Sequence, residues 1–222
     1  MYDTIEAQGI VLDTSLIKEY DKRLVILTEK LGRITVFANG ARRKNSQLTA
    51  VSQKFVMANF KLRPSSQNTY TLISAEIMNT FMDLSYDIEK MAYASYISEV
   101  AGFFTNDGMP AVDELNLIYV TYKTILQDAI PLKLIKSTFE CKLLDIEGLF
   151  SKDELIRISK PKTISQDASF VIDYILSRDI SETYSFKVAD RVINEVEELI
   201  TKYLKTQCDR NFKSLDILES LL

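Results

Sequence analysis

The first part of the chain alternates between apolar and polar positions with a period of two, which is the pattern of strands that bury one face. Residues 4–17 alternate loosely and predict a long first strand, with a bulge or bend at Gly9. Two runs rich in β-branched and large apolar residues, 24–28 and 34–38, follow it. They are separated by a short segment that ends in Gly32, whose freedom to adopt positive φ predicts a hairpin.

Two more strands are expected before the pattern changes. Residues 45–52 are polar and predict a short turn or helix. Residues 55–62 and 70–78 predict a fourth and a fifth strand, and the Pro-Ser-Ser-Gln-Asn segment 64–68 predicts the loop between them. Five strands with a long first strand and a break after the third are typical of an OB-fold barrel, although an SH3-like barrel has a similar strand count.

Beyond residue 84 the apolar positions recur with the helical period of 3.6. Apolar stripes predict helices over residues 86–104, 111–129, 132–147, 164–176, 185–203 and 215–222. Gly148 is expected at the end of one helix, and Ser151 has capping-box spacing to Glu154. We therefore predict an α+β, multi-domain chain with a five-stranded β-barrel of the OB-fold or SH3-like type over residues 1–80 and an all-α helical domain over residues 81–222.

The residue types present exclude several kinds of active site. The chain contains no histidine, and Cys141 and Cys208 are its two cysteines. Ser-His-Asp and Cys-His nucleophilic sites are therefore excluded, whereas carboxylate Mg²⁺ sites and a lysine nucleophile are not. Two distant thiols fit a reducing cytoplasm. The chain begins without the basic and apolar regions of a secretory signal and has no run of about 18 apolar residues, so we expect no membrane span.

Charge is distributed unevenly along the chain. Residues 1–80 carry eleven basic and seven acidic side chains, and the remainder carries sixteen basic and twenty-four acidic ones. A basic N-terminal part suggests a polyanion as partner, although a chance excess on a solvated surface would look the same.

The candidate DNA-binding residues are basic side chains of the predicted barrel. Arg42, Arg43 and Lys44 follow the turn signal Asn39-Gly40, where they can reach several phosphates. The other candidates on the predicted sheet are Arg23, Arg33, Lys54, Lys61 and Arg63. The aromatic residues Phe37, Phe55, Phe60 and Tyr70 could stack on bases, but alternation places some of them in the core.

We expect no enzyme. The carboxylates Asp190, Glu195 and Glu198 could bind Mg²⁺ in principle, but lysines and arginines are interleaved with them at helical spacing, as on a solvated face. The chain has neither a P-loop nor a GxGxxG motif.

The hairpin segment resembles the N-terminal domain of bacterial recombination mediators of the RecO family. The matching positions are Glu19, Asp21, Arg23, Leu24, Leu27, Thr28, Gly32, Arg33, Ile34, Ala38, Gly40, Ala41, Arg42 and Arg43. The helix signature Phe139-Glu140 to Gly148 and the terminal Lys213-Ser214-Leu215 extend the resemblance over nearly the whole chain. One departure is clear: residues 150–166 lack the four cysteines with which many members bind zinc, so we expect no metal and no cofactor.

The resemblance favours the OB-fold for the five-stranded barrel, and it implies a recombination mediator in DNA repair. Such a protein binds single- and double-stranded DNA, anneals complementary strands and helps load RecA onto DNA coated with single-strand-binding protein. It also implies RecR and the acidic C-terminal tail of the single-strand-binding protein as partners, and a cytoplasmic, nucleoid-associated location. Alternatives are a stand-alone OB-fold binder of single-stranded DNA or RNA, a scaffold that binds protein only, or an Mg²⁺-dependent nuclease.

The tail of the single-strand-binding protein needs an apolar groove with a cation at its rim. We expect that groove among the helices, with rim cations drawn from Lys123, Lys133, Lys136, Lys142, Arg191, Lys202 and Lys205. In the alternative, all apolar stripes are buried in the core and the tail competes with DNA for the basic barrel.

Overall fold

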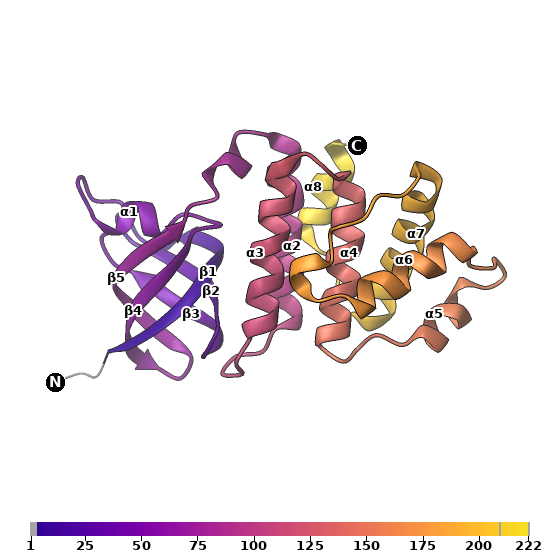
Figure 1. Cartoon of the computed structure of the whole chain (residues 1–222). Helices are drawn as coiled ribbons and strands as arrows, with labels where there is room; N and C mark the ends of the chain where they lie inside the picture. The colour runs from indigo at the N-terminus through magenta and orange to yellow at the C-terminus, as the bar shows by residue number, and fades with distance from the viewer. Residues whose placement is uncertain (1–3, 209, 222) are drawn as a thin grey trace. The chain divides into compact units, whose positions relative to one another are not determined.

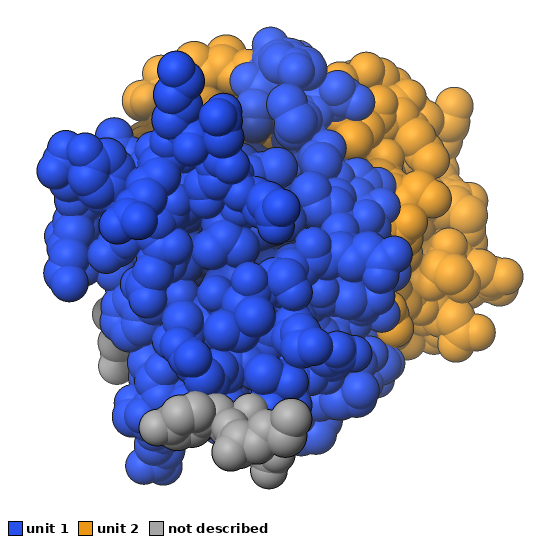
Figure 2. All heavy atoms as spheres, turned by 90° about the vertical axis from the view of Figure 1, so that its left-hand side faces the viewer, with its two compact units in different colours: residues 1–87, 101–115 blue, residues 88–100, 116–222 orange. Residues whose placement is uncertain are grey.

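The structure, a computed structural model, describes residues 4–208 and 210–221. It divides into two compact units (Figure 2). The barrel unit comprises the chain up to residue 87 together with residues 101–115, and the helical unit comprises residues 88–100 and the chain from residue 116 onward. The expected division into a nucleic-acid-binding domain over residues 1–80 and a helical domain over residues 81–222 stays a prediction.

Five strands of the described chain close into a barrel (Figure 1). They are β1 (Ile5–Leu16), β2 (Lys22–Thr28), β3 (Gly32–Ala38), β4 (Met57–Ser66) and β5 (Thr69–Asn79). The order around the barrel is β1-β2-β3-β5-β4, with β4 pairing back to β1 and a parallel contact between β3 and β5. This is the OB-fold order, so the predicted architecture is confirmed. Each described strand supplies buried side chains to one core, among them Val11, Leu24, Val36, Phe60 and Leu72.

Two details of the strands differ from the expectation. β4 continues through the exposed Pro64 to Ser66, which shortens the predicted loop 64–68 to a turn in which Asn68 has a φ of 53°. The pairing shifts register after Pro64, and such an irregularity tolerates a proline that has no N–H to donate. The bulge expected at Gly9 lies instead between Val11 and Asp13.

The turn between β2 and β3 is secured by short-range and long-range hydrogen bonds. Gly32 has the expected positive φ, 65°, and the Thr28 hydroxyl bonds to the carbonyl of Gly32 at 3.0 Å. Residues 106–111 of the same unit pack on this turn: the Gly108 N–H donates to the Leu31 carbonyl at 2.9 Å, and Gly32 forms a β-bridge with Asp107. The hairpin is thus anchored to a segment more than 70 residues later in the chain.

The remaining elements of the described chain are helices. The bounds are α1 (Leu48–Val51), α2 (Ile88–Phe104), α3 (Val112–Gln127), α4 (Leu132–Ile146), α5 (Lys152–Ser159), α6 (Gln166–Ser177), α7 (Asp190–Gln207) and α8 (Lys213–Leu221), with 3₁₀ turns η1 (Met82–Ser85) and η2 (Ile180–Glu182). In the helical unit α4 is the central helix, since its residues 134–144 are all buried and it packs on α6 and α7.

The ends of the helices follow the expected signals except at α7. Gly148 has a φ of 68° just after α4, and the Ser151 hydroxyl accepts from the Glu154 N–H to cap α5. The expected start of the next-to-last helix at residue 185 is wrong, because α7 begins at Asp190. Tyr184, which precedes α7, is buried with its hydroxyl 2.6 Å from that of Thr121. This contact fixes Tyr184 in the segment before the helix.

Candidate nucleic-acid interface

Two loops at one end of the barrel are joined into a single structure, here called the loop pair: residues 17–21 before β2 and residues 39–46 after β3. The Asp21 carboxylate accepts from the Gly40 N–H at 2.7 Å. Arg42 donates its backbone N–H to the Tyr20 carbonyl at 3.0 Å and its guanidinium N–H to the Glu19 carbonyl at 2.9 Å. Gly40 has a φ of 70°, which a side-chain-bearing residue adopts only with strain. These bonds fix the backbone from which the cations project.

Arg42, Arg43 and Lys44 are exposed on the loop pair. The guanidinium carbon of Arg43 lies 5.8 Å from the ring centroid of Tyr20, within the range of a cation–π contact. Tyr20 is itself 44% exposed. Its pKa is raised, mainly by a hydrogen bond with the Glu19 side chain and then by burial, against the opposing charge of Arg43, so the hydroxyl is neutral at physiological pH. Lys18 of the first loop is exposed as well, so the loop pair presents four cations and one aromatic ring.

Four outward side chains form a second feature, here called the outer row, that crosses four strands. Arg23 on β2 pairs with Phe37 on β3, Phe37 with Thr71 on β5, and Thr71 with Arg63 on β4. Their chain neighbours Leu24, Val36, Leu62 and Leu72 are buried in the core, so the four members of the row point outward. Since neighbouring strands lie about 4.8 Å apart, the Cα atoms of the two arginines are at most roughly 15 Å apart. The outer row thus places a partly exposed ring between two cations.

The other predicted cations lie elsewhere. Arg33 is at the far end of β3, where its Nε donates to the Asp107 carboxylate at 3.0 Å and its Nη1 to the Gly102 carbonyl. Lys61 lies 3.9 Å from the Glu6 carboxylate, and the Lys54 ammonium lies 5.2 Å from the ring centroid of Phe55. Of the eight predicted cations, the structure therefore groups three on the loop pair and two on the outer row.

The barrel aromatics are divided between core and surface. Phe55, Phe60 and Tyr70 are buried, which confirms core packing for these three. Phe37 is partly exposed on the outer row. Tyr20, which sequence reasoning did not select, is more exposed than Phe37. The sequence signal that could have found it is an aromatic residue in a polar loop just before a basic strand.

A buried cation supports the loop pair from within. The ammonium of Lys22 donates to the Ser52 carbonyl at 3.1 Å and so ties β2 to the end of α1. Burial lowers the pKa of Lys22, and the nearby charge of Arg42 lowers it further. The exposed cations of the loop pair therefore have a further positive group behind them.

Comparison with known proteins shows which proteins this chain resembles. The family model "Recombination protein O N terminal" matches residues 1–81. Over these residues the chain is similar to the RecO family. It is similar to the DNA repair protein RecO of Alkaliphilus metalliredigens, with 28% identity over 98% of this chain and 99% of the relative. The RecO proteins of Acetivibrio thermocellus (25%, covering 98% and 97%) and Clostridium perfringens (32%, covering 65% and 58%) are further relatives.

The described residues were also compared with the expectations on metal binding and membrane spans. Among the residues that the structure describes, no group of three His, Cys, Asp or Glu side chains is placed to hold a metal ion. Within the same residues, no helix is long and apolar enough to cross a membrane.

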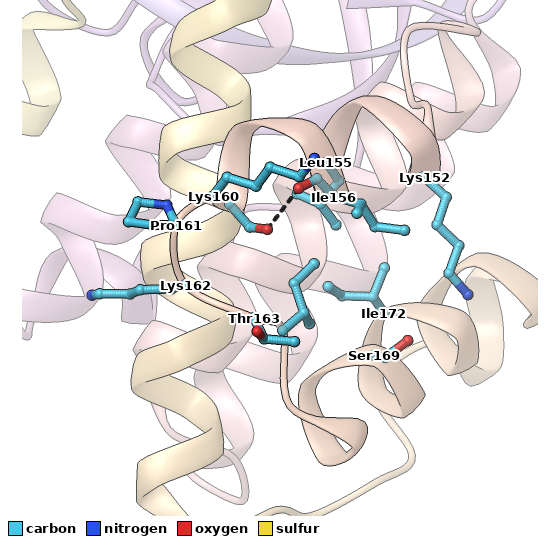
Figure 3. Close-up of a pocket in the computed structure, with 11 residues that line it drawn as sticks. Lys152, Leu155, Ile156, Lys160, Pro161, Lys162, Thr163, Ser169 and Ile172 are labelled. Carbon is cyan, nitrogen blue, oxygen red and sulfur yellow. Dashed lines mark hydrogen bonds between the residues drawn. The ribbon is translucent and has the colours of Figure 1, made fainter.

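The helical unit contains an apolar pocket of about 730 Å³ between α5 and α6 (Figure 3). Leu155, Ile156 and Ile172 point into it, and Lys152 and Lys162 extend on opposite sides. The full lining is Lys152, Leu155, Ile156, Ser159, Lys160, Pro161, Lys162, Thr163, Ile164, Ser169 and Ile172, with no carboxylate among them.

The expected rim cations are placed differently. None of them lines the pocket between α5 and α6. Lys136, Lys202 and Lys205 instead line a smaller pocket of about 420 Å³ together with Glu197 and Glu198. An acidic ligand there would meet two carboxylates, so the pocket between α5 and α6 suits an anionic peptide better.

Proposed function

We propose that this protein is a recombination mediator in DNA repair. Its relatives bear the name DNA repair protein RecO, which supports a role in DNA repair. It binds single- and double-stranded DNA, anneals complementary strands and helps load RecA onto DNA coated with single-strand-binding protein. The observation that carries the proposal is the loop pair, in which Arg42, Arg43 and Lys44 project from a hydrogen-bonded backbone at one end of an OB barrel. Such cations bind phosphates without regard to sequence.

Annealing by this surface requires no catalytic group. Two complementary strands repel each other through their phosphates, and cations that neutralise those phosphates reduce the repulsion. The pairing energy of the bases then drives the reaction. On this proposal the protein is not an enzyme, and it acts beside the nucleoid in the cytoplasm.

The division of labour follows the predicted domains. We assign DNA binding to residues 1–80 and protein binding to residues 81–222, with RecR as one partner. The acidic tail of the single-strand-binding protein fits the pocket between α5 and α6, because that pocket combines an apolar floor with lysines at its rim. Lys152 and Lys162 are paired with Asp173 and Glu198, both at 2.7 Å, and the exposed Lys160 is the best placed to meet a terminal carboxylate.

A salt series tests the DNA-binding proposal. The double variant Arg42→Gln/Arg43→Gln removes up to two phosphate contacts, so the slope of log K against log salt should flatten by up to about 1.8. The control Arg157→Gln/Arg178→Gln removes the same charge from exposed ion pairs of the helical unit and should leave the slope unchanged. If both double variants show the same slope of log K against log salt, the loop pair is not part of the DNA site.

Two further assays separate the alternatives. Annealing of complementary oligonucleotides coated with single-strand-binding protein distinguishes a mediator from a simple binder, because a simple binder would not act on the coated strands. A fluorescent tail peptide titrated into the whole protein should lose affinity in Ile156→Asp and keep it in Arg42→Gln/Arg43→Gln. Displacement of the peptide by short DNA would support the barrel as the tail site instead.

A further inference from the structure

The ring of Tyr20 is held ready for a planar ligand. Arg43 covers one face of the ring, while 44% of the residue stays open to solvent. The backbone around it is tied to the second loop, because the Tyr20 carbonyl accepts from the Arg42 N–H and the carboxylate of the next residue, Asp21, accepts from the Gly40 N–H. An aromatic side chain fixed by its own loop loses little conformational freedom when a second ring stacks on it.

Phe37 is the second ring of this surface. The outer face of a barrel strand is ordinarily polar, yet here it carries a partly exposed phenylalanine. Its cross-strand neighbours are Arg23 on one side and Thr71 followed by Arg63 on the other. A base stacked on Phe37 would therefore have a guanidinium available for the backbone on either side.

The two rings belong to the same end of one hairpin. Phe37 pairs with Arg23 near the start of β2, and Tyr20 lies in the loop that leads into β2. From these placements we propose that Tyr20 and Phe37 bind unpaired bases, so that this surface of the barrel selects single-stranded DNA over duplex. The inference rests on the proposed DNA-binding function and names the form of DNA that this site takes.

The physical reason for the selection is the availability of base faces. In a duplex each base is stacked between its neighbours, and extracting one requires breaking both stacking and pairing. A duplex therefore uses the cations of the loop pair and the outer row only. A single strand uses the same cations and adds stacking on the two rings, which does not depend on base identity.

The test compares three probes of equal length: oligothymidylate, an abasic oligonucleotide with the same phosphates, and a duplex. The protein should bind oligothymidylate at least about 5-fold more tightly than the abasic strand, in line with stacking on one base. Tyr20→Leu and Phe37→Leu should each lose roughly 5-fold on oligothymidylate and little on the abasic strand or the duplex. Their salt slopes should match that of the unchanged protein, because the number of phosphate contacts is the same.

Two additional variants keep the result interpretable. Ile77→Ala removes an exposed apolar side chain from β5 outside the outer row and should not alter discrimination between the probes. Since the chain has no tryptophan, Tyr20→Trp introduces a single reporter whose fluorescence should be quenched by oligothymidylate but not by the abasic strand.

The outcomes separate this inference from the function on which it rests. If the protein binds all three probes with a steep salt dependence but without preferring oligothymidylate to the abasic strand, base stacking is overturned and DNA binding stands. Equal losses on both single strands in Tyr20→Leu and Phe37→Leu would likewise overturn stacking, because the rings would then act through folding. If no probe binds, both proposals fail.

Discussion

The buried ion pair of α4 allows a quantitative prediction about the helical unit. The Lys136 ammonium lies 3.0 and 3.2 Å from the two carboxylate oxygens of Glu140, and both side chains are almost completely buried. The Tyr96 hydroxyl of α2 donates to the same carboxylate, and Lys136 also donates to the Thr201 hydroxyl of α7 at 3.1 Å. The pair thus connects the central helix to α2 and α7.

The expected effect follows from removing one partner at a time. Lys136→Met leaves a buried carboxylate without its cation, and Glu140→Met leaves a buried ammonium, each at a cost of about 3–5 kcal/mol in the free energy of unfolding. If the two changes were independent, the double variant would lose about 6–10 kcal/mol. Because the double variant leaves no buried charge, it should lose only about 1–3 kcal/mol, mainly from the unpaired hydroxyls of Tyr96 and Thr201.

The assay is urea unfolding, followed by amide hydrogen exchange in α4 and α7, since a chain with two compact units need not unfold in one step. Lys152→Met is the matched control, because its partner Asp173 forms an ion pair that is half exposed and is worth at most about 1 kcal/mol. If Lys136→Met destabilises no more than Lys152→Met, or if the effects of the two single changes add, the reasoning is wrong.

Three further predictions concern the barrel turn, the C-terminal helix and metal. Gly32→Ala should lose roughly 1–2 kcal/mol for left-handed backbone strain alone, and more because the new Cβ would lie 2.3 Å from the Asn106 carbonyl oxygen; urea unfolding measures the total. Burial alone would raise the pKa of Glu99, but hydrogen bonds from Ser214 and from the Lys213 N–H at the start of α8 outweigh it and lower that pKa. The stability that this carboxylate adds should therefore be present above its unfolded-state pKa and be lost as pH falls through its lower folded-state pKa. Over that pH range the Ser214 amide should exchange faster than the intrinsic pH dependence of amide exchange alone would give. The variant Glu99→Gln should lack this additional increase in the exchange rate. Elemental analysis should find no stoichiometric zinc, and a chelator should leave the melting temperature unchanged; one zinc per chain would contradict this.

Local patterns in the sequence were sufficient for the elements and several of their ends. The period of two and the period of 3.6 report which side of each element is buried, so they identify strands and helices from neighbouring residues alone. Gly32 and Gly148 mark positions where φ is positive. The Ser151 hydroxyl caps α5 by accepting from the N–H of Glu154, three residues later. Each of these signals depends on interactions within a few residues, which a linear pattern contains.

The grouping of side chains into an interface was decided by tertiary structure. Arg23 and Arg63 are brought into one row only because β5 inserts between β3 and β4, and sequence spacing carries no record of that order. Arg33, like Arg23, is a cation on a β-strand. Its guanidinium nevertheless donates to the carboxylate of Asp107, which lies 74 residues later in the chain. Tyr20 gains its cation from Arg43 across a loop contact. Which exposed cations and rings face a common ligand is set by strand order and register, and these arise from pairing between residues far apart in the chain.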